Sequence, residues 1–149
     1  LQRSAALEAG VAAHADWTIA AQLNGDFTQA KAYEETIAYL QSSPAPDVVY
    51  CENDNMCFGV MQALDERGIA YGDGGVTLIS FDAGRTALSY CKDGKIDLCA
   101  ECNPLHGPRV RALIVQLARG ETPEKLSYMP EALFTADTLT AELLESRGY

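Results

Sequence analysis

Acidic and amide side chains follow each of the four strands that the sequence predicts, at the point where the strand ends. Six such residues are expected at one edge of the sheet: Asp26, Asn53, Asp54, Asp82, Glu101 and Asn103. The carboxyl ends of parallel strands lie along a common edge, which is where open α/β sheets bind their ligands. Because planar carboxylates and amides can each span two neighbouring hydroxyls, this edge is suited to a polyol such as a sugar.

Two further side chains could complete a sugar site. Arg3 begins the first predicted helix and offers a forked hydrogen-bond donor, and Phe27 offers an apolar ring to the C–H face of a sugar. Capping is the competing explanation for an acidic residue that follows a strand. We therefore expect Asn53 to face the ligand and Asp54 to cap the helix that begins near Met56.

The sequence gives little support for catalysis, for cofactor or metal binding, or for redox chemistry. We find no nucleophile with its base, no phosphate-binding glycine motif and no cluster of metal ligands, so we expect no catalytic residue, no cofactor and no metal site. Cys99 and Cys102 have the C-x-x-C spacing of redox proteins, but they lie on a predicted strand rather than at a helix N-terminus. The odd total of five cysteines favours free thiols. A small α/β enzyme or redox protein stays open as an alternative.

Helices and strands alternate along the chain and must position these side chains. The predicted strands are 16–23, 47–53, 76–81 and 96–101, and the predicted helices are 3–14, 27–43, 56–68, 83–95, 107–120 and 136–148. Strands that read as continuous apolar runs are typical of sheets covered on both faces. The pattern predicts an α/β fold of three αβα layers, with a mostly parallel, doubly wound, Rossmann-like sheet.

Composition limits the size of the domain and its partners. A chain of 149 residues that is 48% hydrophobic and 21% charged suits one domain with a sizeable core. The net charge of −10 repels phosphate backbones, so nucleic acid is not an expected partner. No apolar run approaches the ~20 residues that a bilayer crossing needs.

Five motifs, in this order and spacing, resemble the C-terminal lobe of type I periplasmic binding proteins, the solute receptors of sugar ABC transporters. They read "GDFTQAK", "VVYCENDNMCFGVMQAL", "LISFDAG", "DGKIDLCAECNPLHGP" and "TPEKLSYMPEALFTADT". The similarity extends over nearly the whole chain and is strongest to the galactofuranose-binding branch. It implies a type I periplasmic binding protein fold and a monosaccharide ligand, either galactofuranose-like or another hexose or pentose.

The resemblance also implies which residues bind the sugar. An Arg that begins the first helix of the lobe matches Arg3, and an aromatic residue after Gly-Asp matches Phe27. The Asn of an N-D-x-M motif matches Asn53, the Asp after the next strand matches Asp82, and the polar residue near the crossover between lobes matches Glu101. Such receptors bind and release their ligand without making or breaking a bond.

Finally, the resemblance implies that residues 1–149 are a partial domain. The chain would begin inside the C-terminal lobe, after its first strand, and residues 104–128 would belong to a missing N-terminal lobe. The expected partners are that lobe and a transporter permease, and the expected location is extracytoplasmic, in the periplasm or lipid-anchored at the cell surface. The effector domain of a LacI-type transcriptional regulator has a similar fold and stays open as the alternative.

Overall fold

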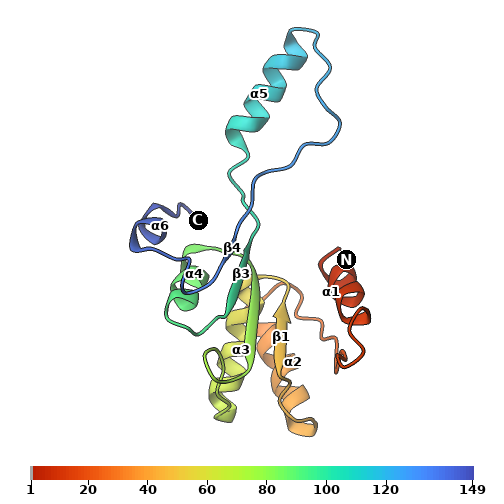
Figure 1. Cartoon of the computed structure of the whole chain (residues 1–149), viewed down its shortest axis with the longest axis vertical. Helices are drawn as coiled ribbons and strands as arrows, with labels where there is room; N and C mark the ends of the chain where they lie inside the picture. The colour runs from red at the N-terminus through yellow and green to blue at the C-terminus, as the bar shows by residue number, and fades with distance from the viewer. Residues whose placement is uncertain (1) are drawn as a thin grey trace.

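The computed structural model describes residues 2–149, and a four-stranded sheet lies at its centre (Figure 1). The strands are β1 (Val48–Cys51), β2 (Thr77–Asp82), β3 (Leu98–Glu101) and β4 (Leu133–Phe134). The helices are α1 (Gln2–Ala12), α2 (Gln29–Ser42), α3 (Asp54–Arg67), α4 (Arg85–Lys92), α5 (Gly107–Ala118) and α6 (Ala141–Ser146). Helices lie on both sides of the sheet, which confirms the predicted α/β class.

The sheet is mostly parallel, as expected. β1, β2 and β3 run in the same direction and lie in chain order, joined by α3 and α4, and the short β4 pairs antiparallel with β3. Because the crossovers from β1 to β2 and from β2 to β3 advance in one direction, their helices α3 and α4 lie on the same face of the sheet. β4 was not predicted, because two residues are too few to give an alternating pattern.

The core lies between the sheet and the helices α3 and α4. Leu78 of β2 is fully buried against Leu64 of α3 and Leu88 of α4, within one continuous hydrophobic cluster. Since side chains alternate along a strand, Tyr50 and Phe81 lie on the opposite face. There the two rings meet edge to face, with their centroids 5.0 Å apart.

The predicted strand at residues 16–23 is wrong. The structure has no strand there, and its large apolar side chains, Trp17, Ile19 and Leu23, are exposed. A strand forms only when a neighbour completes its hydrogen bonds, and no described strand pairs with this segment. Apolar, β-forming composition was therefore not a sufficient signal for a strand.

Helices α2 and α3 pack at unusually close range through a glycine. A Cβ atom placed on Gly59 of α3 would lie 2.2 Å from the backbone oxygen of Gln29 in α2. Only a glycine allows the two backbones to approach in this way. The contact fixes α3, whose N-cap is the predicted site residue Asn53, against α2.

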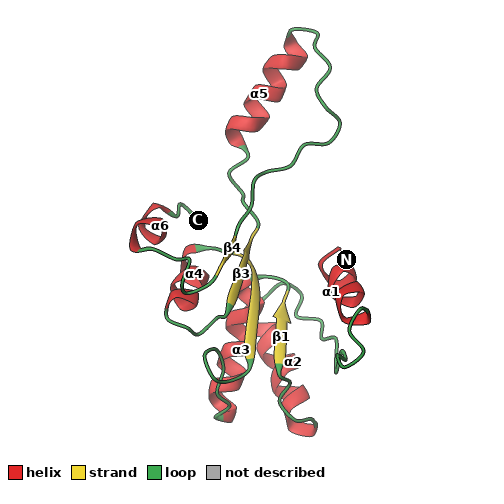
Figure 2. Cartoon of the chain, in the orientation of Figure 1, coloured by secondary structure: helices red, strands yellow, loops and turns green. Residues whose placement is uncertain are grey.

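The helix α5 and the segment that follows it form an arm that extends away from the sheet (Figure 2). At the base of the arm the Glu101 amide donates a hydrogen bond to the Ala132 carbonyl at 2.9 Å. Val110, Ile114 and Leu117 of α5 are all exposed. Among residues 2–149, no helix combines the length and the hydrophobicity that crossing a bilayer requires.

Candidate functional site

Arg3 and Asp82 meet at the carboxyl edge of the sheet. Arg3, in the first turn of α1, places Nη2 at 3.3 Å from Oδ1 of Asp82, which ends β2. The Arg3 guanidinium also lies over the Phe81 ring, 4.8 Å from its centroid. This ion pair is half-exposed, so both partners keep hydrogen-bonding capacity for a ligand.

Glu52, which had no role assigned from the sequence, connects α1 to β1. Its backbone carbonyl accepts a hydrogen bond from Arg3 Nη1, and its Oε1 accepts one from the Ser4 hydroxyl at 2.5 Å. The Tyr50 hydroxyl donates to the Arg3 carbonyl at 3.3 Å. The first turn of α1 is therefore held at the end of β1, and it carries the Arg3 guanidinium to this edge.

Asn53 is the residue that caps α3. Its Oδ1 accepts a hydrogen bond of 2.8 Å from the Met56 amide, and its Nδ2 donates one of 3.1 Å to the Phe27 carbonyl. Asn53 thus joins the loop that contains Phe27 to the end of β1. Asn53 is 8% exposed, and the second N–H of its Nδ2 takes no part in these contacts.

The prediction that Asp54 caps α3 is wrong, because Asp54 lies inside the helix. Its Oδ1 accepts a hydrogen bond of 2.6 Å from the Ser80 hydroxyl, and its Oδ2 accepts one of 2.8 Å from the Gly84 amide. Burial raises the pKa of the Asp54 carboxyl, and the hydrogen bonds from Ser80 and Gly84 oppose this rise. Sequence proximity to the helix start could not distinguish Asn53 from Asp54, since both residue types cap helices well.

Strained backbone marks two of the loops at this edge. Asp26 and Phe27 have φ angles of 47° and 54°, and Asp82 and Ala83 have φ angles of 99° and 58°. Within the described residues these are the only non-glycine residues with positive φ. Such conformations cost about 1–3 kcal/mol each and concentrate at functional sites. Here they coincide with two loops that carry predicted ligand residues.

Glu101 ends β3, pairs in register with Asp82, and has partners of its own. Its Oε1 accepts hydrogen bonds of 2.5 Å from Arg147 Nη1 and from the Tyr149 hydroxyl, and its Oε2 accepts one of 3.1 Å from the Ala132 amide. Burial would raise the pKa of Glu101, but the hydrogen bonds from Tyr149 and Arg147 and the charge of Arg147 outweigh it and lower the pKa below 4.5. Arg147 and Tyr149 lie far along the sequence from Glu101, and no local pattern predicted this contact.

The contacts among the five predicted site residues form two groups at this edge. Asn53 reaches the Phe27 carbonyl, Arg3 reaches Asp82, and the carbonyl of Asp82 accepts a hydrogen bond from the amide that follows Glu101. The Phe27 side chain is 62% exposed and free to contact a ligand. The edge combines guanidinium and amide donors, carboxylate acceptors and one exposed ring.

The other two residues of the predicted edge, Asp26 and Asn103, lie in local turns, to which Asp26 contributes its backbone amide and Asn103 its side chain. Oδ1 of Asn24 accepts from the Asp26 amide, and Oδ1 of Asn103 accepts from the Leu105 amide, as in Asx turns. Of the C-x-x-C motif, Cys99 lies on β3 and is buried, whereas Cys102 follows the strand and is exposed. In the part of the chain that the structure describes, no three His, Cys, Asp or Glu side chains are arranged to hold a metal ion.

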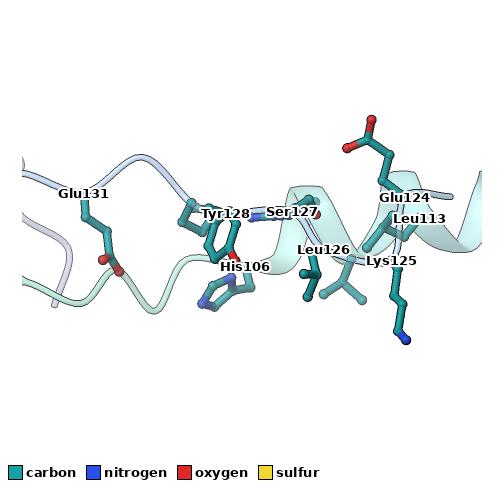
Figure 3. A pocket seen from close by; sticks show the side chains of 11 residues that line it. His106, Leu113, Glu124, Lys125, Leu126, Ser127, Tyr128 and Glu131 are labelled. Carbon is teal, nitrogen blue, oxygen red and sulfur yellow. Dashed lines mark hydrogen bonds between the residues drawn. The ribbon is translucent and has the colours of Figure 1, made fainter. Parts of the chain in front are cut away.

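Two hollows lie beyond the centre of this edge. The larger, about 500 Å³, lies along the arm, between α5 and the segment that runs back beside it, and is lined by side chains such as Leu113, Leu126 and Tyr128 (Figure 3). The smaller, about 190 Å³, is lined by Glu101, Arg147 and Tyr149 among others. The smaller hollow adjoins the predicted site residues, whereas the larger one belongs to the arm.

Comparison with known proteins identifies similar chains. A family model described as "Periplasmic binding protein domain" matches residues 1–121. The galactofuranose-binding protein YtfQ of Escherichia coli (strain K12) is 31% identical over 129 residues, which are 84% of this chain and 40% of that protein.

Solved structures are similar in fold as well. A Mycobacterium smegmatis protein in complex with β-D-fucofuranose has a TM-score of 0.82 and 29% identity, over 90% of this chain and 44% of that one. The periplasmic binding protein component of the arabinose ABC transporter of Shewanella sp. ANA-3, bound to α- and β-L-arabinofuranose, has a TM-score of 0.85 and 25% identity, over 97% of this chain and 48% of that one. The chain thus spans less than half the length of these relatives.

Proposed function

Because the chain belongs to the periplasmic binding protein domain family, we propose that it is the C-terminal lobe of an ABC-transporter receptor that binds a monosaccharide between two lobes. The observation that carries the proposal is the position of Arg3, which pairs with Asp82 and donates to the carbonyl of Glu52, next to Asn53, at an edge flanked by two strained loops. Ligand binding would stabilise a closed form of the receptor, which a membrane permease recognises.

Each predicted residue has a distinct role in this proposal. Arg3 and Asn53 donate hydrogen bonds to sugar oxygens, Asp82 accepts from neighbouring hydroxyls, and Phe27 lies against the apolar face of the ring. Glu101 is the fifth ligand residue. Its carboxylate has about four lone-pair sites, of which three are used within the protein, so it can accept one sugar hydroxyl.

The proposed ligand is a hexose or pentose. The names of similar proteins mention galactofuranose, fucofuranose and arabinofuranose, so five-membered ring forms are the first candidates for this chain. A furanose, like any monosaccharide, presents closely spaced hydroxyls beside a patch of C–H groups. The edge described above offers partners for both.

We assign the arm, about residues 104–128, to the N-terminal lobe of the intact receptor. The exposed side chains of Val110, Ile114 and Leu117 support this, since a second lobe would cover them. The receptor would then act outside the cytoplasm, in the periplasm or anchored at the cell surface, and would carry out no chemical step.

Isothermal titration of the full-length receptor with D-galactose, D-fucose, L-arabinose and D-fructose tests the proposal. We expect at least one of these sugars to bind, and Asp82→Ala or Asn53→Ala to weaken its binding by about tenfold or more, as expected for losing a hydrogen bond to a polar or charged group. Asn55→Ala is the matched control, because Asn55 is exposed in the first turn of α3, two residues after Asn53. Unchanged affinity in both site variants would refute the site.

Phe27→Ala tests the stacking role separately. We expect sugar affinity to fall by about fivefold, from the ~1 kcal/mol that an aromatic contact adds, with little change in stability because the ring is 62% exposed. Leu23→Ala is the control, because Leu23 is a nearby apolar side chain that is 48% exposed. Equal effects of the two substitutions would contradict a specific role for Phe27.

A further inference from the structure

Arg147 is nearly buried beside Glu101, at the carboxyl edge of the sheet. The side chains of Arg147 and Glu101 are only 9% and 10% exposed, and their ion pair is 2.5 Å long. The guanidinium lies over two rings, 5.0 Å from the centroid of Phe134 and 4.8 Å from that of Tyr149. An arginine stacked in this way has little freedom to reorient, so it fixes the carboxylate to which it donates.

The backbone around Arg147 is held in place by α4. Arg85, the first residue of α4, donates from Nε to the Arg147 carbonyl at 2.9 Å, and its amide donates to the Tyr149 carbonyl at 2.7 Å. The segment that carries Arg147 and Tyr149 therefore has a fixed position relative to α4. The two residues act as a rigid support rather than as mobile side chains.

Glu101 is supported from two directions at the base of the arm. Arg147 and Tyr149 bind Oε1, while the Ala132 amide binds Oε2 from the segment that returns from the arm. Figure 1 shows that the chain leaves the sheet for the arm after β3 and returns at β4, with the C-terminal end nearby. The orientation of this carboxylate is thus set by contacts from two separate segments.

We propose that Arg147 and Tyr149 are positioning residues, which hold the Glu101 carboxylate in the orientation that accepts a sugar hydroxyl. The inference rests on the proposed function, because it requires Glu101 to be a ligand residue. A free glutamate side chain loses rotational freedom when it binds, whereas one that is already held does not. The hollow of about 190 Å³ beside Glu101, Arg147 and Tyr149 provides space next to the carboxylate.

Variants of the full-length receptor test the inference, with whichever of D-galactose, D-fucose and L-arabinose the wild type binds. We expect Arg147→Met to weaken binding by about tenfold and Arg147→Lys to recover part of the loss. Tyr149→Phe, which removes only a hydroxyl, should weaken binding by about threefold to tenfold. Arg67→Met is the control. Arg67 is the last residue of α3, at the end away from Asn53, and it donates a hydrogen bond to the Leu40 carbonyl of α2.

The pH profile of sugar affinity separates positioning from a general loss of structure. The charged or titratable groups around Glu101 are Arg147 and Tyr149 from the C-terminal segment and Asp82 from β2. Without the Arg147 charge, Glu101 should protonate at a higher pH, so the acid limb of the affinity profile should move to higher pH. Glu101→Gln should remove this limb.

The outcomes are distinguishable. Unchanged affinity in Arg147→Met and Tyr149→Phe, with wild-type binding intact, would refute the positioning role and leave the proposed function standing. The positioning role would also be refuted by a general loss of structure. In that case Arg147→Met would bind more weakly and lose thermal stability in parallel, Arg147→Lys would recover none of the affinity, and the acid limb of the affinity profile would stay at its wild-type pH. A wild-type receptor that binds none of the sugars would refute both proposals.

Discussion

The Ser80 hydroxyl donates a hydrogen bond of 2.6 Å to Oδ1 of Asp54, and both side chains are buried. Ser80 belongs to β2 and Asp54 to the first turn of α3, so the contact joins a strand to the helix that crosses over it. The other carboxylate oxygen of Asp54 holds the Gly84 amide, immediately after the strained residues Asp82 and Ala83. The Asp54 carboxylate therefore supports the backbone on which Asp82 is presented.

Ser80→Ala is expected to destabilise the protein. The substitution leaves a buried carboxylate oxygen without its donor, which costs about 2 kcal/mol in the free energy of unfolding for a hydrogen bond to a charged group. Urea denaturation would measure the change. Ser89→Ala, at an exposed position of α4, should change stability by less than about 0.5 kcal/mol. Equal stabilities of the two variants would contradict a role for the Ser80 contact.

Asp54→Asn should alter how stability depends on pH. Burial raises the pKa of Asp54 above 3.8, so the folded protein binds this proton more tightly than the unfolded chain does. The contribution of Asp54 to stability therefore falls as the pH rises from below 3.8 through the folded pKa. The free energy of unfolding of the wild type, minus that of the variant, should decrease over this range. A constant difference, from urea titrations at several pH values, would disprove the expectation.

Two helical glycines should respond to alanine in opposite ways. Gly59→Ala would bring a Cβ to 2.2 Å from the Gln29 carbonyl oxygen, so α2 and α3 must separate and the protein should lose about 1–3 kcal/mol or more. Gly10→Ala meets no atom within 4 Å on α1 and should stabilise that helix by about 0.5–1 kcal/mol. Thermal melting of both variants measures the contrast, and a shift of the same sign in both would contradict the packing described here.

Native thiol labelling should single out one cysteine of the five. Cys102 is exposed, whereas Cys51, Cys57, Cys91 and Cys99 are buried. The hydrogen bond with Cys91, together with burial, raises the pKa of the Cys99 thiol and keeps it from forming the reactive thiolate. We expect iodoacetamide to modify Cys102 alone in the native protein, as read by mass spectrometry. Rapid labelling of Cys99 would instead favour the redox alternative.

The sequence was a good guide to the elements of the sheet centre. The strands at β1, β2 and β3 are apolar runs that end in polar residues, and burial on a covered face makes that pattern necessary. It was a poor guide to residues 16–23, because strand formation depends on a neighbour and not only on composition. The short β4 likewise depends on its pairing with β3.

The candidate site was predictable in its position but not in its internal contacts. Parallel strands place their ends together, so Asn53, Asp82 and Glu101 could be expected at one edge. Their partners could not, because Arg147 and Tyr149 reach Glu101 from a distant part of the chain. The capping role was assigned to Asp54 instead of Asn53 for a related reason, since only the geometry of the first turn determines which side chain meets the Met56 amide.

The hydrogen bond between the Glu101 amide and the Ala132 carbonyl holds the two ends of the arm side by side. The arm is therefore connected to the sheet in the way that an insertion between two adjacent strands would be. The two ends of the arm are neighbours across an antiparallel pair, so a tight turn could replace it without moving a strand. Exchange of whole arms between related chains would also leave the sheet register unchanged. Recombination at this point could therefore bring a new surface to an existing sheet in one step, while the residues that hold the sheet together stay as they are.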